Sequence, residues 1–240
     1  MKNILKFGLA GIAAIVLSSV LTNSSAQERQ MFAGTYTIAG KSPDGTAYTG
    51  TMTIASYGDG YRLTQKIGDE TYRGIGTDVG DNLAGAYISG GKPSVTIYRV
   101  TSGNTMTGFW QDYDNQKEGT EAVTVLGATA FSGISKVLAA TTWNYSGTYG
   151  INGKNPDGSA YTGTMVVSDY GAGYRVRFTS GGTTWRGIAT YIGSYFAIAW
   201  QAGGIPQVAI FSGNPSTGDL KGYYQDYDSL KEGTEVATLK

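Results

Sequence analysis

The sequence contains neither cysteine nor histidine. Without cysteine the chain has no disulfide and no thiol nucleophile, so its fold must be held together by core packing. Without histidine it lacks the commonest general base, a common metal ligand and the usual pH-sensitive side chain. These absences exclude the most frequent catalytic arrangements. We therefore expect a protein that is not an enzyme, has no catalytic residues and uses no cofactor.

An excess of positive charge is also missing. Basic and acidic residues number 18 each, so the formal net charge is zero. Removing Lys2 and Lys6 with the N-terminal segment described next leaves 16 basic and 18 acidic residues, a net charge of −2. Nucleic-acid-binding proteins need a basic surface to meet the phosphate backbone. We expect no nucleic-acid partner.

The first 26 residues have the pattern of an export signal. Lys2 and Lys6 give it a basic start, an apolar run of 15 residues follows from Phe7 to Leu21, and small residues lead up to Ala26. This pattern predicts a signal peptide over residues 1–26 that is cleaved after Ala26. The apolar run is shorter than the roughly 20 residues that span a bilayer. We expect an exported protein, periplasmic or extracellular, with no membrane span in its mature chain.

The rest of the chain is a tandem duplication. Residues 34–62 and 147–175 are identical at 20 of 29 positions, at a constant offset of 113. The segments QDYDNQKEGTE (residues 111–121) and QDYDSLKEGTE (residues 225–235) match at an offset of 114. Each repeat is long enough to be a domain. We expect one copy over residues 27–127, a linker over residues 128–143 and a second copy over residues 144–240.

Each copy has the composition of short strands and tight turns. The chain contains 37 glycines and 18 tyrosines, and short alternating runs are separated by glycine-rich turns. Eight strands in up-and-down order favour closure, which removes exposed edges. The expected fold is all-β, with two tandem eight-stranded antiparallel barrels similar to calycins or avidins. Expected strands are 33–39, 46–55, 60–67, 70–77, 82–88, 94–101, 104–111 and 120–126, then 146–152, 159–168, 173–180, 183–190, 194–200, 206–212, 219–225 and 234–239.

Alternation along the strands predicts which side chains face each barrel lumen. On the second strand Tyr48, Met52 and Ile54 share one face, opposite a row of threonines. The fourth strand is ambiguous, because either the aromatic residue or the arginine of Tyr72-Arg73 could point inward. An eight-stranded barrel holds its own side chains or one small ligand. The inward aromatic residues therefore line a ligand pocket or fill a core: Tyr36, Tyr48, Tyr61, Tyr87, Trp110, Tyr149, Tyr161, Tyr174, Trp200 and Tyr224.

The densest group of charges lies in the segment shared by both copies. It comprises Asp112, Asp114, Lys117, Glu118 and Glu121, and its counterpart comprises Asp226, Asp228, Lys231, Glu232 and Glu235. Alternate carboxylates could bind Ca²⁺, but the spacing does not follow the calcium-binding loop of EF-hands. We expect a solvated loop with local ion pairs and no metal. An Arg–Glu pair that closes a barrel end is a further possibility, since Arg62, Arg73, Arg175 and Arg186 also recur.

The string G-x-Y-x-I-x-G-x-x-P-D-G-x-x-Y-x-G-T, followed by Y-R, a Y/W-R-G-I segment and G-T-E, resembles small exported bacterial proteins often labelled fibronectin-binding. The strand pattern and the early G-T-Y are also similar to avidins and lipocalins. The first resemblance implies a surface or matrix-binding role. We expect a non-enzymatic protein that binds an extracellular macromolecule through its barrel loops. The alternative is a carrier of a small apolar or aromatic ligand in the lumen.

Overall fold

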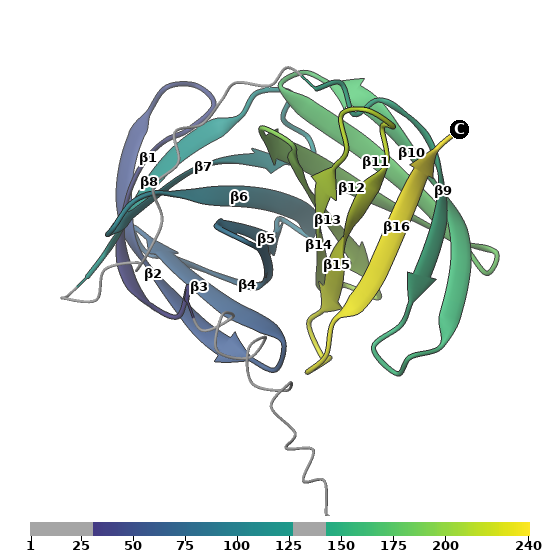
Figure 1. Ribbon diagram of the computed structural model, residues 1–240. Coiled ribbons are helices and arrows are strands. Elements are labelled where there is room, and N and C mark those ends of the chain that lie inside the picture. Colours follow the sequence, from purple (N-terminus) through teal and green to yellow (C-terminus); the bar gives the residue numbers. More distant parts are fainter. Residues whose placement is uncertain (1–30, 127–142) are drawn as a thin grey trace, which may run out of the picture.

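Two closed antiparallel barrels lie side by side, each made of eight strands in sequence order (Figure 1). The computed structural model describes residues 31–126 and 143–240. Strand β1 closes the first barrel by pairing with β8, and β9 closes the second by pairing with β16. The expected fold class is therefore confirmed. Within the described ranges, no helix is long and apolar enough to cross a membrane.

The sixteen strands come close to the expected ranges. The first barrel contains β1 (Gly34–Lys41), β2 (Ala47–Tyr57), β3 (Gly60–Ile67), β4 (Glu70–Val79), β5 (Asn82–Ser89), β6 (Lys92–Ser102), β7 (Thr105–Asp112) and β8 (Gly119–Val125). The second contains β9 (Gly147–Lys154), β10 (Ala160–Tyr170), β11 (Gly173–Ser180), β12 (Thr183–Ile192), β13 (Tyr195–Ala202), β14 (Ile205–Gly213), β15 (Leu220–Asp226) and β16 (Gly233–Leu239).

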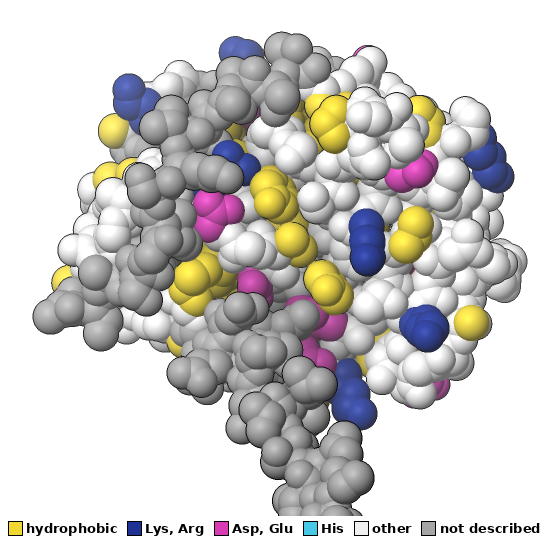
Figure 2. All heavy atoms as spheres, viewed as in Figure 1, with side chains coloured by type: hydrophobic (Ala, Val, Ile, Leu, Met, Phe, Trp, Pro, Cys, Tyr) yellow, Lys and Arg dark blue, Asp and Glu magenta, His cyan; other side chains and the backbone are white. Residues whose placement is uncertain are grey.

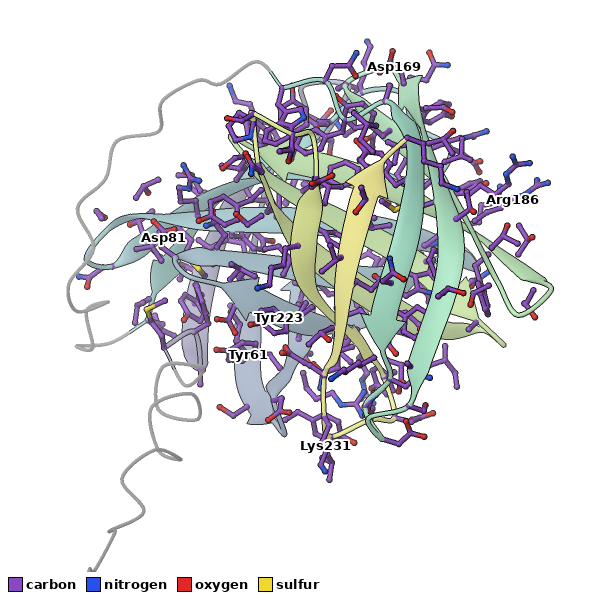
Figure 3. All side chains as sticks on the ribbon, turned by 45° about the vertical axis from the view of Figure 1, so that its right-hand side comes forward. Tyr61, Asp81, Asp169, Arg186, Tyr223 and Lys231 are labelled. Carbon is purple, nitrogen blue, oxygen red and sulfur yellow. The ribbon has the colours of Figure 1, made fainter. Side chains whose placement is uncertain are left out.

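Alternation places the expected side chains in the lumens. On β2, Met52 and Ile54 are buried while Thr51 and Thr53 are exposed. The fourth-strand ambiguity is also resolved, because Tyr72 packs against the first core and Arg73 is exposed. In the second barrel the equivalent Arg186 is exposed and lies at the outer side of the barrel (Figure 3). The aromatic residue of this pair thus points inward in both copies.

One end of each barrel is capped by the segment that precedes its first strand. Phe32 is fully buried in the first core, and its carbonyl accepts a 2.6 Å hydrogen bond from Tyr36. Tyr145 has the same position in the second barrel, where its carbonyl accepts a 2.8 Å bond from Tyr149. Trp143 stacks on Tyr145 with a centroid distance of 5.3 Å. Access to either lumen must therefore come from the opposite end.

The barrels pack against each other through a buried apolar face that alternation alone did not predict. Strands β4–β6 and β12–β14 bury their outward residues as well as their inward ones, as two sheets packed face to face do. Five residues of this face correspond pairwise between the copies, and Ile192 corresponds to Val79, which is partly buried against the cluster. The cluster consists of Ile75, Ala84, Ala86, Val95 and Ile97 from the first barrel and Ile188, Ile192, Ala197, Ala199, Val208 and Ile210 from the second.

The contacts between the barrels are reciprocal. In one direction the backbone N–H of Asp59 donates to the Leu230 carbonyl, and in the other Ala172 donates to the Gln116 carbonyl, both at 2.7 Å. The β7–β8 and β15–β16 loops, which begin within the QDYD segments, thus each dock on a hairpin tip of the other barrel. The expectation that these loops are solvated is wrong for this part of their surface. The contact with the neighbouring barrel therefore restricts the conformation of each loop.

Aromatic–cation stacking completes this docking. The Arg62 guanidinium lies 3.4 Å from the ring centroid of Tyr227, a residue of the second barrel's QDYD segment. Arg175 makes the reciprocal contact with Tyr113 at 4.7 Å. Such stacking is favourable when the cation is partly desolvated. Arg62 and Arg175, which occupy equivalent positions in the two copies, therefore join the barrels. They do not form the Arg–Glu pair at a barrel end that the sequence left open.

The signal-peptide prediction (residues 1–26) and most of the linker prediction (128–143) fall outside the described residues. Trp143, placed in the linker from sequence, packs against the second core. The surface on view in Figure 2 carries Lys and Arg side chains singly and not as one basic patch.

Candidate functional site

The two lumens differ in size although the barrels share their strand order. The second barrel contains a cavity of about 660 Å³, while that of the first is about 210 Å³. Pockets that hold small organic ligands usually measure about 300–1,000 Å³. The larger cavity extends from Met165 and Ile198 to the turns at Asp157 and Gly181. The second barrel thus has room for a small ligand, whereas the first is largely filled.

A continuous row of aromatic rings lines the larger cavity. Tyr161 contacts Phe178 on one side and Tyr224 on the other, edge to face, with centroid distances of 6.4 and 6.1 Å. Phe178 continues to Trp185 at 5.6 Å, and Tyr224 continues to Trp200 at 6.5 Å. All five residues line the cavity. Rings held by their neighbours in this way present fixed apolar faces to a ligand.

Glu235 is the acidic group inside this aromatic lining. It lies on β16, lines the cavity and is 7% exposed. Burial raises its pKa to about 7, and a hydrogen bond with Tyr161 opposes the rise. Removing a carboxyl group from water disfavours its charged form unless donors or cations replace the water. The carboxyl group is therefore poised between its neutral and ionised forms near neutral pH.

Glu121, the counterpart in the first barrel, has a fuller set of partners. Tyr48 donates to one carboxylate oxygen at 2.7 Å, and Tyr98 donates a short bond to the other. The Gln65 amide also approaches that second oxygen, at 3.5 Å. Burial raises the pKa of Glu121, and these three hydrogen bonds oppose the rise. Protein groups thus satisfy this carboxylate without a ligand.

Two replacements account for the different hydrogen-bond partners of the two glutamates. At the constant offset of 113, Gln65 corresponds to Phe178 and Tyr98 corresponds to Phe211. Both replacements remove a hydrogen-bond donor that the first barrel directs at its glutamate. Only the tyrosine pair, Tyr48 and Tyr161, is kept. The second barrel therefore retains the buried carboxyl group but not most of its internal partners.

The ten aromatic residues singled out from sequence are all in the lumens, but they divide into two groups. Tyr48, Tyr87 and Trp110 line the smaller cavity, and Tyr161, Trp200 and Tyr224 line the larger. The other four pack within the two cores and are lining residues of neither cavity: Tyr36, Tyr61, Tyr149 and Tyr174.

The expectation that Glu121 and Glu235 belong to a solvated loop is wrong, because both are buried. Alternation on β8 contained the correct signal, because Gly119, Glu121 and Val123 are buried in turn. The nearby charges of the QDYD segment obscured that signal. Across residues 31–126 and 143–240, no three acidic side chains gather in a group that could hold a metal ion.

No protein-family model matches the chain, and no curated protein matches it. A crystal structure of a protein of unknown function from the DUF3598 family of Nostoc punctiforme is 14% identical, with a TM-score of 0.29, and the match covers 91% of this chain and 100% of that one. A candidate outer membrane protein from Bacteroides fragilis is 11% identical, with a TM-score of 0.32, and the match covers 89% and 99%. At these values neither structure says what this chain binds, and neither is described as binding fibronectin.

Proposed function

We propose that the protein is a non-enzymatic binding protein whose second barrel takes a small aromatic or apolar ligand into its lumen. The observation that carries the proposal is the cavity of about 660 Å³ lined by five mutually packed aromatic rings. Apolar walls with a few convergent polar groups are typical of small-ligand sites. Glu235 supplies such a polar group, and the turns at one end of the barrel supply the rim.

Packing of the two barrels disfavours recognition of a macromolecule through the QDYD loops. The QDYD loops already dock on the opposite barrel through backbone hydrogen bonds of 2.7 Å. The buried apolar face also holds the two copies together, so they are not two modules on a flexible tether. The gain in avidity expected of such modules needs freedom to reach two sites. Export through residues 1–26 belongs to the same proposal, and its support is the sequence pattern.

The proposal is tested with the full chain and the neutral apolar dye N-phenyl-1-naphthylamine. We expect one dye molecule to bind per chain, with enhanced dye fluorescence and quenching of tryptophan emission. Ala209→Trp should weaken binding by about tenfold or more, because Ala209 lines the large cavity and the indole would fill it. Thr96→Trp is the matched control at the equivalent position of the first barrel.

Circular dichroism and thermal unfolding of both variants check that each has folded. Equal dye affinity in the folded Ala209→Trp variant and the original chain would contradict a lumen site. Absence of dye binding by the original chain would contradict it as well.

A further inference from the structure

The first barrel serves as an internal reference for the second. Both barrels bury a glutamate at the same place, but only Glu121 has donors from three side chains. In the second barrel two of these donor positions are Phe178 and Phe211. A buried carboxyl group that lacks donors costs folding free energy unless something else supplies them. A ligand that enters the cavity lined by Glu235 could supply hydrogen-bond donors in place of the two that are absent, beside the one from Tyr161.

We propose that the ligand of the second barrel is an organic cation, a protonated amine on an aromatic or apolar body, and that its ammonium group pairs with Glu235. The proposal rests on the function proposed above, because it names the chemistry of the ligand at that same site. An ammonium group can donate up to three hydrogen bonds and matches the charge of an ionised carboxylate.

The charges around the cavity agree with a cationic ligand. Asp157, Asp226 and Glu235 are lining residues, and Arg186 is the basic residue among the lining side chains that the structure describes. Arg186 is exposed and lies toward the outer side of its barrel (Figure 3), so its charge is well solvated. The lining thus carries an excess of negative charge, and the one deeply buried charge-bearing group is Glu235.

The aromatic row adds a second attraction for a cation. The faces of Tyr and Trp rings carry negative electrostatic potential and bind ammonium groups, most strongly where water is excluded. Tyr161 hydrogen-bonds to Glu235, and Tyr224, which packs against Tyr161, also lines the cavity. Trp200 follows Tyr224 in the row. A carboxylate flanked by aromatic faces recognises a cation in preference to a neutral or anionic group.

Binding should depend on pH in a direction fixed by Glu235. Its pKa lies near 7, so raising the pH from 6 to 8 ionises it and should strengthen binding of an amine that stays protonated. The other groups facing the cavity keep their charge over this range: burial raises the pKa of the Tyr161 and Tyr224 phenols, and hydrogen bonds lower that of Asp157. The remaining charged lining groups are Asp226, which is partly buried, and Arg186, which is exposed.

The experiment is displacement of N-phenyl-1-naphthylamine from the full chain by three probes of similar shape. These are phenethylamine, which is cationic, 2-phenylethanol, which is neutral, and phenylacetate, which is anionic. At pH 8 we expect the amine to bind about tenfold or more tightly than the alcohol, as a charge-assisted bond implies. The amine's advantage should shrink at pH 6, whereas the affinity for the alcohol should stay constant.

Two variants attribute the preference to Glu235. Glu235→Gln should abolish the amine's advantage while the dye still binds. Phe178→Gln combined with Phe211→Tyr should also reduce it, because these residues rebuild the donors that satisfy Glu121 in the first barrel. Glu121→Gln is the matched control and should leave the amine-to-alcohol ratio unchanged.

The outcomes separate the two proposals. Dye binding with equal affinity for amine and alcohol, or with a preference for phenylacetate, overturns the cationic-ligand inference and leaves the lumen function standing. An amine preference that survives in folded Glu235→Gln also overturns it. Failure of the dye and of all three probes to bind overturns both proposals together.

Discussion

At the scale of single residues, the two lumen glutamates show how identical side chains acquire different energetics from their neighbours. Glu121 has three hydrogen-bonding partners, whereas Tyr161 is the partner that opposes the pKa rise of Glu235. For a glutamate whose pKa rises from 4.5 to about 7 on folding, the folded state favours the protonated form. The associated stability is complete below about pH 4.5 and is lost as the pH rises through 7.

We therefore expect Glu235→Gln to raise the melting temperature of the unliganded protein at pH 8 and to change it little at pH 5. Glu121→Gln should lower the melting temperature at both pH values, because it leaves buried donors poorly matched, at a cost of about 1–3 kcal/mol. A change of 1 kcal/mol corresponds to about 2–4 °C for a chain of this size. Thermal unfolding followed by circular dichroism measures both. Equal losses in the two variants at pH 8 would contradict the assignment of different environments.

At the scale of strands and turns, the hairpin tips show where the interface constrains local conformation. Gly58 has a φ of +60°, and a Cβ there would lie 1.7 Å from the Leu230 carbonyl oxygen of the other barrel. Gly68 has nearly the same φ, +59°, but no atom lies within 4 Å of the position its Cβ would take. An L-residue would be equally strained at both positions. Only at Gly58 would its Cβ also collide with the other barrel.

Alanine at each position should separate these two effects. Gly68→Ala should cost about 1–2 kcal/mol, the left-handed penalty alone. Gly58→Ala should cost clearly more, because the Leu230 carbonyl must move and its 2.7 Å bond from Asp59 is weakened. Denaturant unfolding gives both free energies. Amide exchange at Asp59 should accelerate in Gly58→Ala and not in Gly68→Ala. Equal costs would show that the turn does not depend on the barrel contact.

The sequence alone predicts the strands well, because each has clear alternation and glycine-rich turns on both sides. It does not predict the interface between the barrels, although the sequence of β5 contains a signal for it. Leu83, Ala84, Gly85, Ala86 and Tyr87 are buried without interruption, and such an apolar run indicates a strand covered on both faces. The cavity could not be predicted either, because the free space inside a barrel depends on how the lining side chains, Phe178 among them, pack in three dimensions.

At the scale of the whole molecule, the two barrels form one body with a shared apolar face. Its cluster of isoleucine, valine and alanine is nearly inaccessible to solvent. Separating the copies would expose this face on both, and contiguous apolar patches of that kind promote association. The repeat suggests that each copy folds independently. The stability of each copy in the full chain nevertheless depends in part on the apolar face that it shares with the other.

We expect residues 143–240 expressed alone to fold as a barrel and to self-associate through this face. Corresponding strands meet reciprocally in the full chain, so a copy can pair with itself. Ile188→Lys combined with Ile210→Lys should yield a monomer, because it places charges on the association face. Sedimentation equilibrium measures the assembly state, and Lys221→Glu, an exposed change outside the apolar cluster, serves as the control. A monomer without the lysine substitutions would contradict the prediction.

The reciprocal interface has a consequence for the descent of the molecule. Gln111 donates a hydrogen bond to the Tyr170 carbonyl at a hairpin tip of the second barrel, and Gln225 donates the equivalent bond to the Tyr57 carbonyl of the first. Such reciprocal contacts are those of a symmetric homodimer. Gene duplication and fusion of such a dimer would free one lumen from the needs of the other. Mutations inside a barrel alter side chains on the opposite face of the strand from the interface. One copy can thus keep a lumen whose buried glutamate is hydrogen-bonded by its own side chains, while the other copy diverges toward binding a ligand. The interface between the barrels is preserved in both cases.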